Sequence, residues 1–260
     1  LGSGGFGDVY KVRQHESGQF YALKTEDVDI DSRLNRLKVR SPLPDFYFQS
    51  QYRKHFLRLV DRGVTSKFKF IVMPIVGMSL DKIRREVLNG AQFSKQCAIK
   101  ICVQTLNAVR DLHDIGFLHR DLKLANFAIG IDRPNHETIF MLDFGIAKRI
   151  ADVFCREPRE KVAFMGTRRY ASRACHQMKE QGRKDDVESC LSGFGYGCLF
   201  AVNDVYLSIP REMSLIFDYI NTLVFEDMVD FDYILDILGR IVEVNHWKVS
   251  RGQALERRFN

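Results

Sequence analysis

Two short segments of the sequence carry the residue types that phosphate chemistry requires. His119 to Asn126 reads HRDLKLAN, and Asp143-Phe144-Gly145 follows 22 residues after Asp121. A carboxylate such as Asp121 can orient and deprotonate an incoming hydroxyl, while an amide and a second carboxylate, Asn126 and Asp143, can hold Mg²⁺. The β-like run between the two segments indicates that they are loops of one hairpin. The spacing therefore predicts a site for phosphoryl transfer.

Two further polar residues extend this set. Lys123 stands two residues after Asp121 and adds a cation near the phosphoryl group that would be transferred. The hydroxyl of Thr167 can act with Lys123 from a later loop. A lysine at this position favours Ser and Thr over Tyr as acceptors. We interpret His119 and Phe144 as core residues that support the site and take no part in the reaction.

A glycine-rich turn near the beginning of the sequence could hold phosphates. Gly2, Gly4 and Gly7 lie between two predicted strands, where backbone N–H groups can approach phosphate oxygens without a Cβ in the way. Lys24 closes the second strand and can reach under this turn to neutralise the α- and β-phosphates of ATP. Taken singly, such a hairpin is more often structural, and a strand-end lysine is usually solvated. A strand follows the glycines, which argues against a dinucleotide-binding fold.

The elements that must position these residues change type along the chain. Residues 8–12 and 20–24 alternate as strands do around a turn at 16–18, and residues 67–75 predict another strand. Residues 79–88 and 97–112 carry apolar side chains at helical spacing. A β-rich beginning and a helix-rich remainder predict an α+β fold with two lobes and the chemistry between them.

Bulk properties agree with a globular protein and exclude some function classes. The 260 residues are 45% hydrophobic and 28% charged, without an apolar run long enough to cross a bilayer, so we expect no membrane association. Six cysteines without a CxxC pair favour free thiols and a cytoplasmic or nuclear location. The net charge of +6 is scattered among acidic residues, which favours anionic ligands such as ATP but no nucleic acid.

The motifs together resemble the casein kinase 1 superfamily, in particular its tau-tubulin kinase-like branch. They are LGSGGFG, YALK, HRDLKLANFAIG, MLDFGIAK, GTRRYAS and GRKDDVES, and they cover Leu1 to about Leu191. The GTRRYAS run, Gly166 to Ser172, stands where most protein kinases end their activation segment with Ala-Pro-Glu. The resemblance implies a bilobal protein kinase-like fold and a non-specific protein serine/threonine kinase that uses ATP and Mg²⁺.

The resemblance also implies the residues that line the nucleotide. Met73 would stand at the gatekeeper position, and Pro74 to Gly77 would form the hinge, where the Pro74 carbonyl and the Val76 N–H face the adenine edge. Asp186 would anchor the catalytic loop from a buried helix. The remaining residues expected around the nucleotide are Leu1, Gly2, Gly4, Gly7, Val9, Ala22, Lys24, Ala128 and Leu142.

Three basic residues match a substrate-binding feature of that family. Arg169, Arg183 and Lys184 correspond to positions that form an anion site beside the substrate groove, which implies acidic or already phosphorylated protein substrates. A solvated basic face explains the same residues equally well. We expect a monomer.

The sequence departs from the kinase pattern where a helix C glutamate should pair with Lys24. No Glu occurs between Glu26 and Glu86, and Arg40 takes the expected position, followed by Pro42 and Pro44. Asp27, Asp29 or Asp31 could substitute, although each is shorter and badly placed.

This departure leaves two functions open: an active kinase, or a catalytically impaired pseudokinase that acts as a nucleotide-binding or protein-binding scaffold. We expect an N-lobe over residues 1–76, with a truncated first strand and a divergent helix C region. The C-lobe would span residues 77–260 and be shortened after about residue 191.

Overall fold

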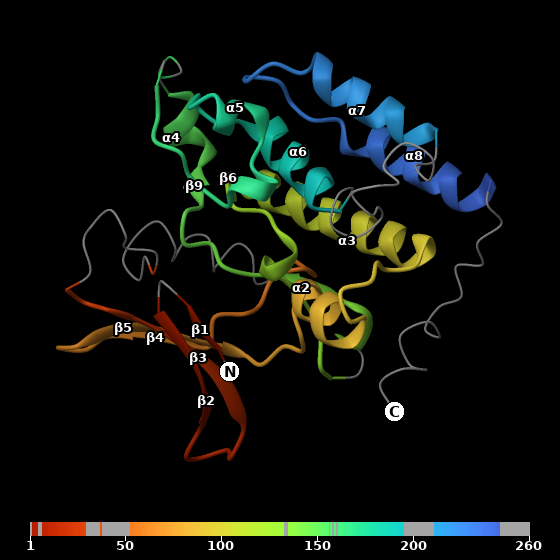
Figure 1. Ribbon diagram of the computed structural model, residues 1–260. Helices are drawn as coiled ribbons and strands as arrows, with labels where there is room; N and C mark the ends of the chain where they lie inside the picture. Colours follow the sequence, from red (N-terminus) through yellow and green to blue (C-terminus); the bar gives the residue numbers. More distant parts are fainter. Residues whose placement is uncertain are drawn as a thin grey trace.

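The described residues of the N-lobe form one antiparallel sheet of five strands. The computed structural model describes residues 2–4, 7–29, 37, 53–132, 135–155, 157, 159, 161–194 and 211–244. The sheet lies in the lower part of Figure 1, and its strand order is β1-β2-β3-β5-β4. The strands are β1 (Gly2–Gly4), β2 (Gly7–Arg13), β3 (Phe20–Asp27), β4 (Asp61–Val64) and β5 (Phe68–Pro74). The predicted hairpin and the predicted strand near residues 67–75 are confirmed. Gly2–Gly4, which were expected in the turn after a truncated first strand, form the short strand β1, and β4 was not predicted.

The strand register places several predicted ligand-binding residues on one face of this sheet. Val9 pairs with Lys24 across β2 and β3, and Ala22 pairs with Met73 across β3 and β5. Paired residues on neighbouring strands share a face, as do residues two apart on one strand. Val9, Ala22, Lys24 and Met73 therefore lie on the same face.

Short elements join the sheet to the helical lobe. After β5 the chain enters α2 (Leu80–Lys82), which continues as a π-helical turn over Ile83–Val87. The Ser79 hydroxyl caps this start by accepting a hydrogen bond from the Lys82 N–H at 3.2 Å. The helical pattern predicted for residues 79–88 is therefore confirmed, as a short α-helix followed by a wider π-helical turn.

The C-lobe is built around α3 (Lys95–Asp114), a long helix that lies centrally in Figure 1. One face of α3 is fully buried, and Leu106, Val109 and Leu112 are 0% exposed. These residues recur at the three- and four-residue spacing that predicted the helix. The other C-lobe elements are β6 (Phe117–Leu118), β7 (Phe127–Ile129), β8 (Ile139–Met141), β9 (Lys148–Arg149), α4 (Ile150–Phe154), α5 (Arg173–His176), α6 (Arg183–Phe194), α7 (Glu212–Thr222) and α8 (Phe231–Val244).

The two helices α7 and α8 extend the C-lobe beyond the part that the sequence patterns predicted. They pack against each other, and α8 also packs against α3, in the upper right of Figure 1. Phe231, Ile234, Leu238 and Ile241 of α8 are buried at helical spacing. The C-lobe was expected to be shortened after about residue 191, and α7 and α8 are helices in that region that the sequence patterns did not predict. The missed signal is this amphipathic repeat.

No helix in the described ranges is both long enough and apolar enough to cross a membrane.

Candidate active site

Asp121, Lys123 and Thr167 form a closed triangle of hydrogen bonds. The Thr167 Oγ1 donates to Asp121 Oδ1 at 2.7 Å, and the Lys123 Nζ donates to Asp121 Oδ2 at 2.8 Å and to Thr167 Oγ1 at 2.9 Å. The Asp121 side chain is only 12% exposed. The predicted contact of Lys123 with Thr167 is confirmed, and both oxygens of the Asp121 carboxylate are held in fixed positions.

Gly166 allows the loop that carries Thr167 to approach the catalytic loop. Its φ is +107°, and a Cβ at this position would lie 2.7 Å from the backbone oxygen of Arg120. An L-residue would meet both the strained backbone and the steric clash. The glycine therefore makes the hydrogen bond from Thr167 to Asp121 sterically possible.

The catalytic loop is held in an unusual backbone conformation by a buried carboxylate. Arg120 has a φ of +67°, in the left-handed region that non-glycine residues rarely adopt. Asp186 of α6 is 2% exposed and accepts hydrogen bonds from the backbone N–H groups of His119 and Arg120, both at 2.8 Å. Burial acts to raise the pKa of Asp186, but the hydrogen bond from His113 and these N–H donors lower it below its ordinary value. The predicted anchoring role of Asp186 is confirmed.

Asn126 and Asp143 flank the β7–β8 hairpin. The Leu142 N–H donates to the Asn126 backbone oxygen at 2.8 Å, which brings the two segments together at this end of the hairpin. The Asn126 Nδ2 donates to the Asp121 backbone oxygen at 2.8 Å, so its Oδ1 is directed elsewhere. Within the described residues, neither Asn126 Oδ1 nor Asp143 Oδ2 accepts a hydrogen bond from the protein.

This donor set fits a magnesium ion that is shared with a nucleotide. Mg²⁺ prefers oxygen ligands and usually takes only one or two from the protein, the others being water and phosphate oxygens. Asn126 and Asp143 supply one amide and one carboxylate oxygen of this kind. No cluster of three or more His, Cys, Asp and Glu side chains that could hold a metal occurs in the described ranges. A metal at Asn126 and Asp143 would therefore complete its coordination with water or phosphate oxygens.

Lys24 forms an ion pair with Asp143. The Lys24 Nζ lies 2.7 Å from Asp143 Oδ1, and the two side chains are 20% and 38% exposed. Burial acts to raise the pKa of Asp143, but the charge and hydrogen bond of Lys24, together with His119 and Lys123, hold the pKa below its ordinary value. Asp27 and Asp29 are exposed at the surface. Lys24 therefore pairs with Asp143, and neither aspartate substitutes for the missing glutamate.

The expected position of that glutamate, occupied by Arg40, lies outside the described residues. So do Asp31, Pro42 and Pro44, together with Leu1 of the glycine-rich turn.

The remaining residues predicted around the nucleotide lie close to this site. Gly7 has a φ of +128°, and a Cβ there would lie 1.9 Å from the Thr25 backbone oxygen, so only glycine fits. Gly2 and Gly4 pair with β2 through their backbones. Val9, Ala22 and Met73 share the Lys24 face of the sheet, whereas Ala128 and Leu142 come from the β7–β8 hairpin.

Two backbone hydrogen bonds join the segment between β5 and α2 to strand β7 of the C-lobe. The Gly77 N–H donates to the Ile129 oxygen at 2.8 Å, and the Ile129 N–H donates to the Met78 oxygen at 3.2 Å. Among the described residues, none accepts a hydrogen bond from the Val76 N–H. This N–H is therefore available to a ligand, as the hinge assignment of Pro74 to Gly77 requires.

His119 and Phe144 support the site from the core. Their ring centroids lie 5.4 Å apart, and Phe144 also contacts Phe56 at 5.8 Å. His119 is 0% exposed and its ring contacts the Leu142 backbone oxygen at 3.1 Å. The interpretation of both residues as core supports is confirmed.

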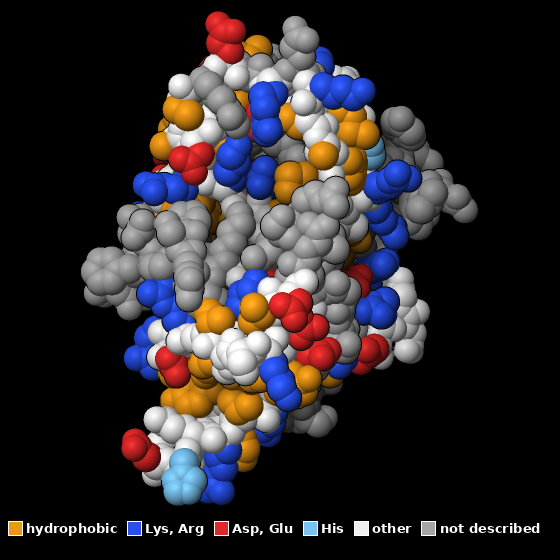
Figure 2. Space-filling model, turned by 90° about the vertical axis from the view of Figure 1, so that its left-hand side faces the viewer, with side chains coloured by type: hydrophobic (Ala, Val, Ile, Leu, Met, Phe, Trp, Pro, Cys, Tyr) orange, Lys and Arg blue, Asp and Glu red, His pale blue; other side chains and the backbone are white. Residues whose placement is uncertain are grey.

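The three basic residues assigned to a substrate anion site face different neighbours. The Arg183 guanidinium lies over the Phe154 ring at 5.0 Å, Arg169 lies 5.9 Å from the Tyr170 ring, and Lys184 lies 3.8 Å from Asp185. Figure 2 shows the face on which α4 and β9 lie, and most of its coloured charged side chains at the C-lobe end are Lys and Arg. The assigned anion site stays a prediction.

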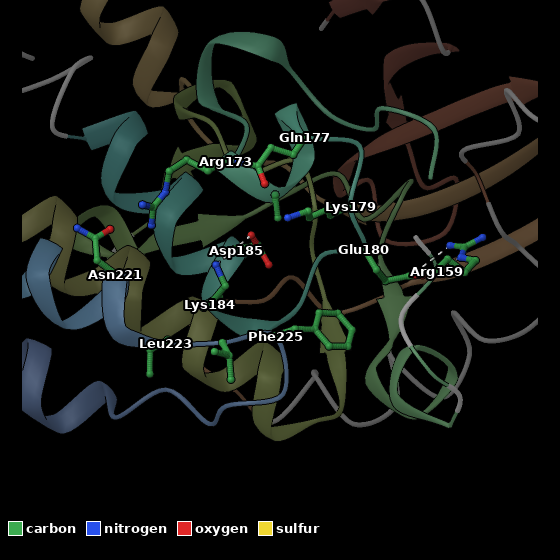
Figure 3. Close-up of a pocket in the computed structure, with 12 residues that line it drawn as sticks. Arg159, Arg173, Gln177, Lys179, Glu180, Lys184, Asp185, Asn221, Leu223 and Phe225 are labelled. Atoms are coloured by element: carbon green, nitrogen blue, oxygen red, sulfur yellow. Dashed lines mark hydrogen bonds and ion pairs between the residues drawn. The ribbon is translucent and has the colours of Figure 1, made fainter. Parts of the chain in front are cut away.

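Two buried glutamates that the sequence analysis missed hold segments near the site. Glu180 is 7% exposed and accepts two hydrogen bonds from Arg159, at 2.7 and 2.9 Å (Figure 3), and one from Lys148 at 3.3 Å. Glu26 is 2% exposed and accepts hydrogen bonds from the Leu37 N–H at 2.9 Å and from Lys69 at 3.3 Å. The position of Glu26, two residues after Lys24 in the same strand, could have suggested a structural role for its carboxylate. The partners of Glu180 are too distant in sequence for any local pattern to predict its burial.

Comparison with known proteins agrees with the fold and with this geometry. The family model described as "Protein kinase domain" matches residues 1–202, and the chain belongs to the protein kinase family. The α+β fold with a β-rich N-lobe and a helical C-lobe is confirmed.

Several relatives of the chain carry the names of serine/threonine kinases. The chain is 40% identical over 173 residues to a Caenorhabditis elegans protein named serine/threonine-protein kinase ZK507.1, an alignment that covers 65% of this chain and 52% of that protein. It is 35% identical over 190 residues to the serine/threonine-protein kinase spe-6 of the same organism, covering 72% and 48%. It is also 30% identical over 193 residues to a C. elegans protein named casein kinase I, C03C10.2, covering 74% and 56%. The chain thus spans about half the length of each of these relatives.

Proposed function

We propose that this chain transfers the γ-phosphoryl group of ATP to Ser and Thr hydroxyls of protein substrates. The observation that carries the proposal is the triangle of Asp121, Lys123 and Thr167 beside Asn126 and Asp143. The carboxylate of Asp121, held by Lys123 and Thr167, would accept the proton of an incoming hydroxyl. The Lys123 ammonium would stabilise the negative charge that develops on the phosphoryl group. Mg²⁺ held by Asn126 and Asp143 would neutralise phosphate charge.

The Lys24–Asp143 ion pair is compatible with this function. A buried charge that loses its partner costs several kcal/mol, and a partly exposed pair such as Lys24–Asp143 costs less because solvent screens it. Binding of ATP with Mg²⁺ supplies phosphate anions to Lys24 and a cation to Asp143, so that both charges keep a partner of opposite sign. The missing glutamate therefore removes an orienting contact from Lys24 without leaving its ammonium unpaired.

The same ion pair supports a second candidate function. Lys24 is held by Asp143 and by no helix C carboxylate among the described residues, so the phosphates would be positioned less firmly than in a kinase with the full pair. A protein of this kind could bind the nucleotide and present a surface to partners without turning ATP over. It would be a pseudokinase scaffold.

Measuring phosphate incorporation into casein and into an acidic peptide separates the two functions. With ATP and Mg²⁺, we expect the chain to label both substrates and Asp143→Ala to lose roughly a hundredfold of this activity. Asp132→Ala removes an exposed carboxylate from the loop between β7 and β8 and should retain it. Equal labelling by the chain and by Asp143→Ala would refute the kinase function. Mg²⁺-dependent ATP binding without labelling would support the scaffold.

The finer assignment to the tau-tubulin kinase-like branch of the casein kinase 1 superfamily is also a proposal. It is supported by the Gly166 to Ser172 motif and by one relative with a casein kinase I name. It implies acidic or already phosphorylated substrates, a monomeric state and a cytoplasmic or nuclear location.

A further inference from the structure

The buried carboxylate of Glu26 lies on the same face of the N-lobe sheet as Lys24. Strand β3 has an inner position in the sheet, between β2 and β5 (Figure 1). Glu26 stands two residues after Lys24 in this strand, and residues two apart on one strand point to the same face. Its partner across β5 is Lys69, just as Ile71 is the partner of Lys24. Glu26 therefore faces the side on which we expect the nucleotide to bind.

Two donors converge on one oxygen of this carboxylate. The Leu37 N–H donates to Glu26 Oε2 at 2.9 Å, and the Lys69 Nζ lies 3.3 Å from the same oxygen. The side chains of Glu26 and Lys69 are 1% and 12% exposed, and Leu37 is 4% exposed. A carboxylate buried to this degree is stable only when hydrogen bonds and an opposite charge replace its water. Leu37 and Lys69 provide both.

The hydrogen bond from Leu37 connects a later part of the chain to the sheet. Leu37 lies 11 residues after Glu26, between β3 and β4 in the sequence. Since Glu26 faces the nucleotide side, the Leu37 backbone lies on this side as well. In a protein kinase with the usual pair, a helix C glutamate connects this part of the chain to the lysine of β3. Here the strand supplies the carboxylate and Leu37 supplies the N–H, so the polarity of the connection is reversed.

The glycine-rich turn contacts the same stretch of β3. A Cβ at Gly7 would clash with the Thr25 backbone oxygen and would lie 3.5 Å from the Glu26 Cα. The Thr25 hydroxyl also donates to the Asp8 backbone oxygen at 3.4 Å. The position of the turn therefore depends on where the β3 backbone lies at Thr25 and Glu26.

Three parts of the proposed phosphate site thus meet around Glu26. They are the turn at Gly7, the ammonium of Lys24 and the chain at Leu37. Without this carboxylate, the Leu37 N–H and the Lys69 ammonium would each lose a buried acceptor, which is costly. The chain at Leu37 would then separate from the sheet and admit water beside Lys24. Because water screens the Lys24 charge, the phosphates would be held less firmly.

We propose that Glu26 is a positioning residue for the nucleotide, which holds the chain at Leu37 against the sheet and thereby orients Lys24 and the glycine-rich turn. Glu26 acts through these neighbours and does not itself bind the nucleotide. Its carboxylate makes the connection between β3 and the following chain that the missing helix C glutamate would otherwise make. This role rests on the proposed nucleotide site, and it applies equally to an active kinase and to a nucleotide-binding scaffold.

Calorimetric titration with Mg²⁺ and a non-hydrolysable ATP analogue tests this role. We expect Glu26→Ala to bind the analogue about tenfold more weakly than the unaltered chain. Glu26→Gln should retain most of the affinity, because its amide oxygen can still accept from the Leu37 N–H. Asp27→Asn removes a negative charge at the next residue of the strand, which is exposed, and should bind as tightly as the unaltered chain.

A double variant separates positioning from stability. Glu26→Leu combined with Lys69→Met replaces the buried ion pair by apolar side chains, an exchange that often leaves stability unchanged or raises it. The same exchange removes the acceptor of the Leu37 N–H. We expect this variant to keep most of its thermal stability and yet to bind the analogue about tenfold more weakly. Hydrogen exchange of its Leu37 amide, followed by NMR, should be about tenfold faster than in the unaltered chain.

Several results would overturn the positioning role. They are equal affinity of Glu26→Ala or of the double variant and the unaltered chain, and equal weakening in Asp27→Asn. A Leu37 amide that exchanges in the unaltered chain as fast as an unprotected amide would overturn the role without any variant. No binding of the analogue by the unaltered chain would refute the proposed function and this role together. Equal binding by all the variants would refute this role alone.

Discussion

Replacing Glu180 by Gln should destabilise the folded chain through the loss of one buried negative charge. The pKa of Glu180 is lowered from an ordinary value of 4.5 to about 2, first because Arg159 donates two hydrogen bonds and then because Lys148 lies close. A tenfold change in proton affinity corresponds to about 1.4 kcal/mol, so the lowered pKa corresponds to about 3 kcal/mol at neutral pH. Because Arg159 is half exposed and screened by solvent, we expect roughly 2 kcal/mol in Glu180→Gln.

The lowered pKa of Glu180 also predicts how the destabilisation in Glu180→Gln depends on pH. The folded pKa of Glu180 lies below the unfolded one, so its stabilisation is complete above about pH 4.5 and declines as the pH falls toward 2. The difference in unfolding free energy between the unaltered chain and Glu180→Gln should therefore narrow across that interval. Urea unfolding followed by far-UV circular dichroism, repeated at several pH values, measures this difference.

A control variant distinguishes the loss of the buried Glu180 ion pairs from the general effect of removing one negative charge. Glu16 is exposed in the turn between β2 and β3, and Glu16→Gln should change the unfolding free energy by less than about 0.5 kcal/mol. If Glu180→Gln proved as stable as Glu16→Gln at neutral pH, or if its deficit did not shrink in acid, the assignment of Glu180 as an ion-pair clamp would be refuted.

The other predictions concern the catalytic loop and its anchor. Thr167→Ala should lower kcat about 10- to 100-fold, because Asp121 and Lys123 lose the hydroxyl that joins them, with little change in the KM for ATP. Thr167→Ser should retain activity, and equal losses in both variants would contradict this role. Asp186→Asn should lower the unfolding free energy by about 3 kcal/mol and reduce kcat, because the amide cannot accept from both His119 and Arg120. Steady-state kinetics and urea unfolding test these results, and unchanged stability of Asp186→Asn would contradict the anchor.

Local sequence patterns predicted the parts of the fold that are formed by interactions between residues close together in the sequence. The β2–β3 hairpin depends on alternation around a short turn, and α3 depends on apolar residues at helical spacing. The catalytic residues followed from their spacing in two loops of one hairpin, and the contact of Lys123 with Thr167 was expected from the same reasoning.

The parts that sequence reasoning missed depend on distant partners or on weaker local signals. Glu180 gains its partners 21 and 32 residues earlier, so no spacing rule identifies it. The pairing of Lys24 with Asp143 crosses 119 residues and replaces the local carboxylates that were considered. The apolar residues of α8 recur at helical spacing, which is a local signal that the sequence analysis missed.

The close approach at Gly166 limits which positions near the candidate active site can be varied in protein engineering. Libraries that vary the exposed residues Arg168 and Arg169 would change side chains next to Thr167 without adding atoms between the two loops. A library that includes position 166 would return mostly inactive clones whatever its chemical diversity, because even one added methyl group forces the two loops apart. Engineering of this surface should therefore treat that position as part of the scaffold.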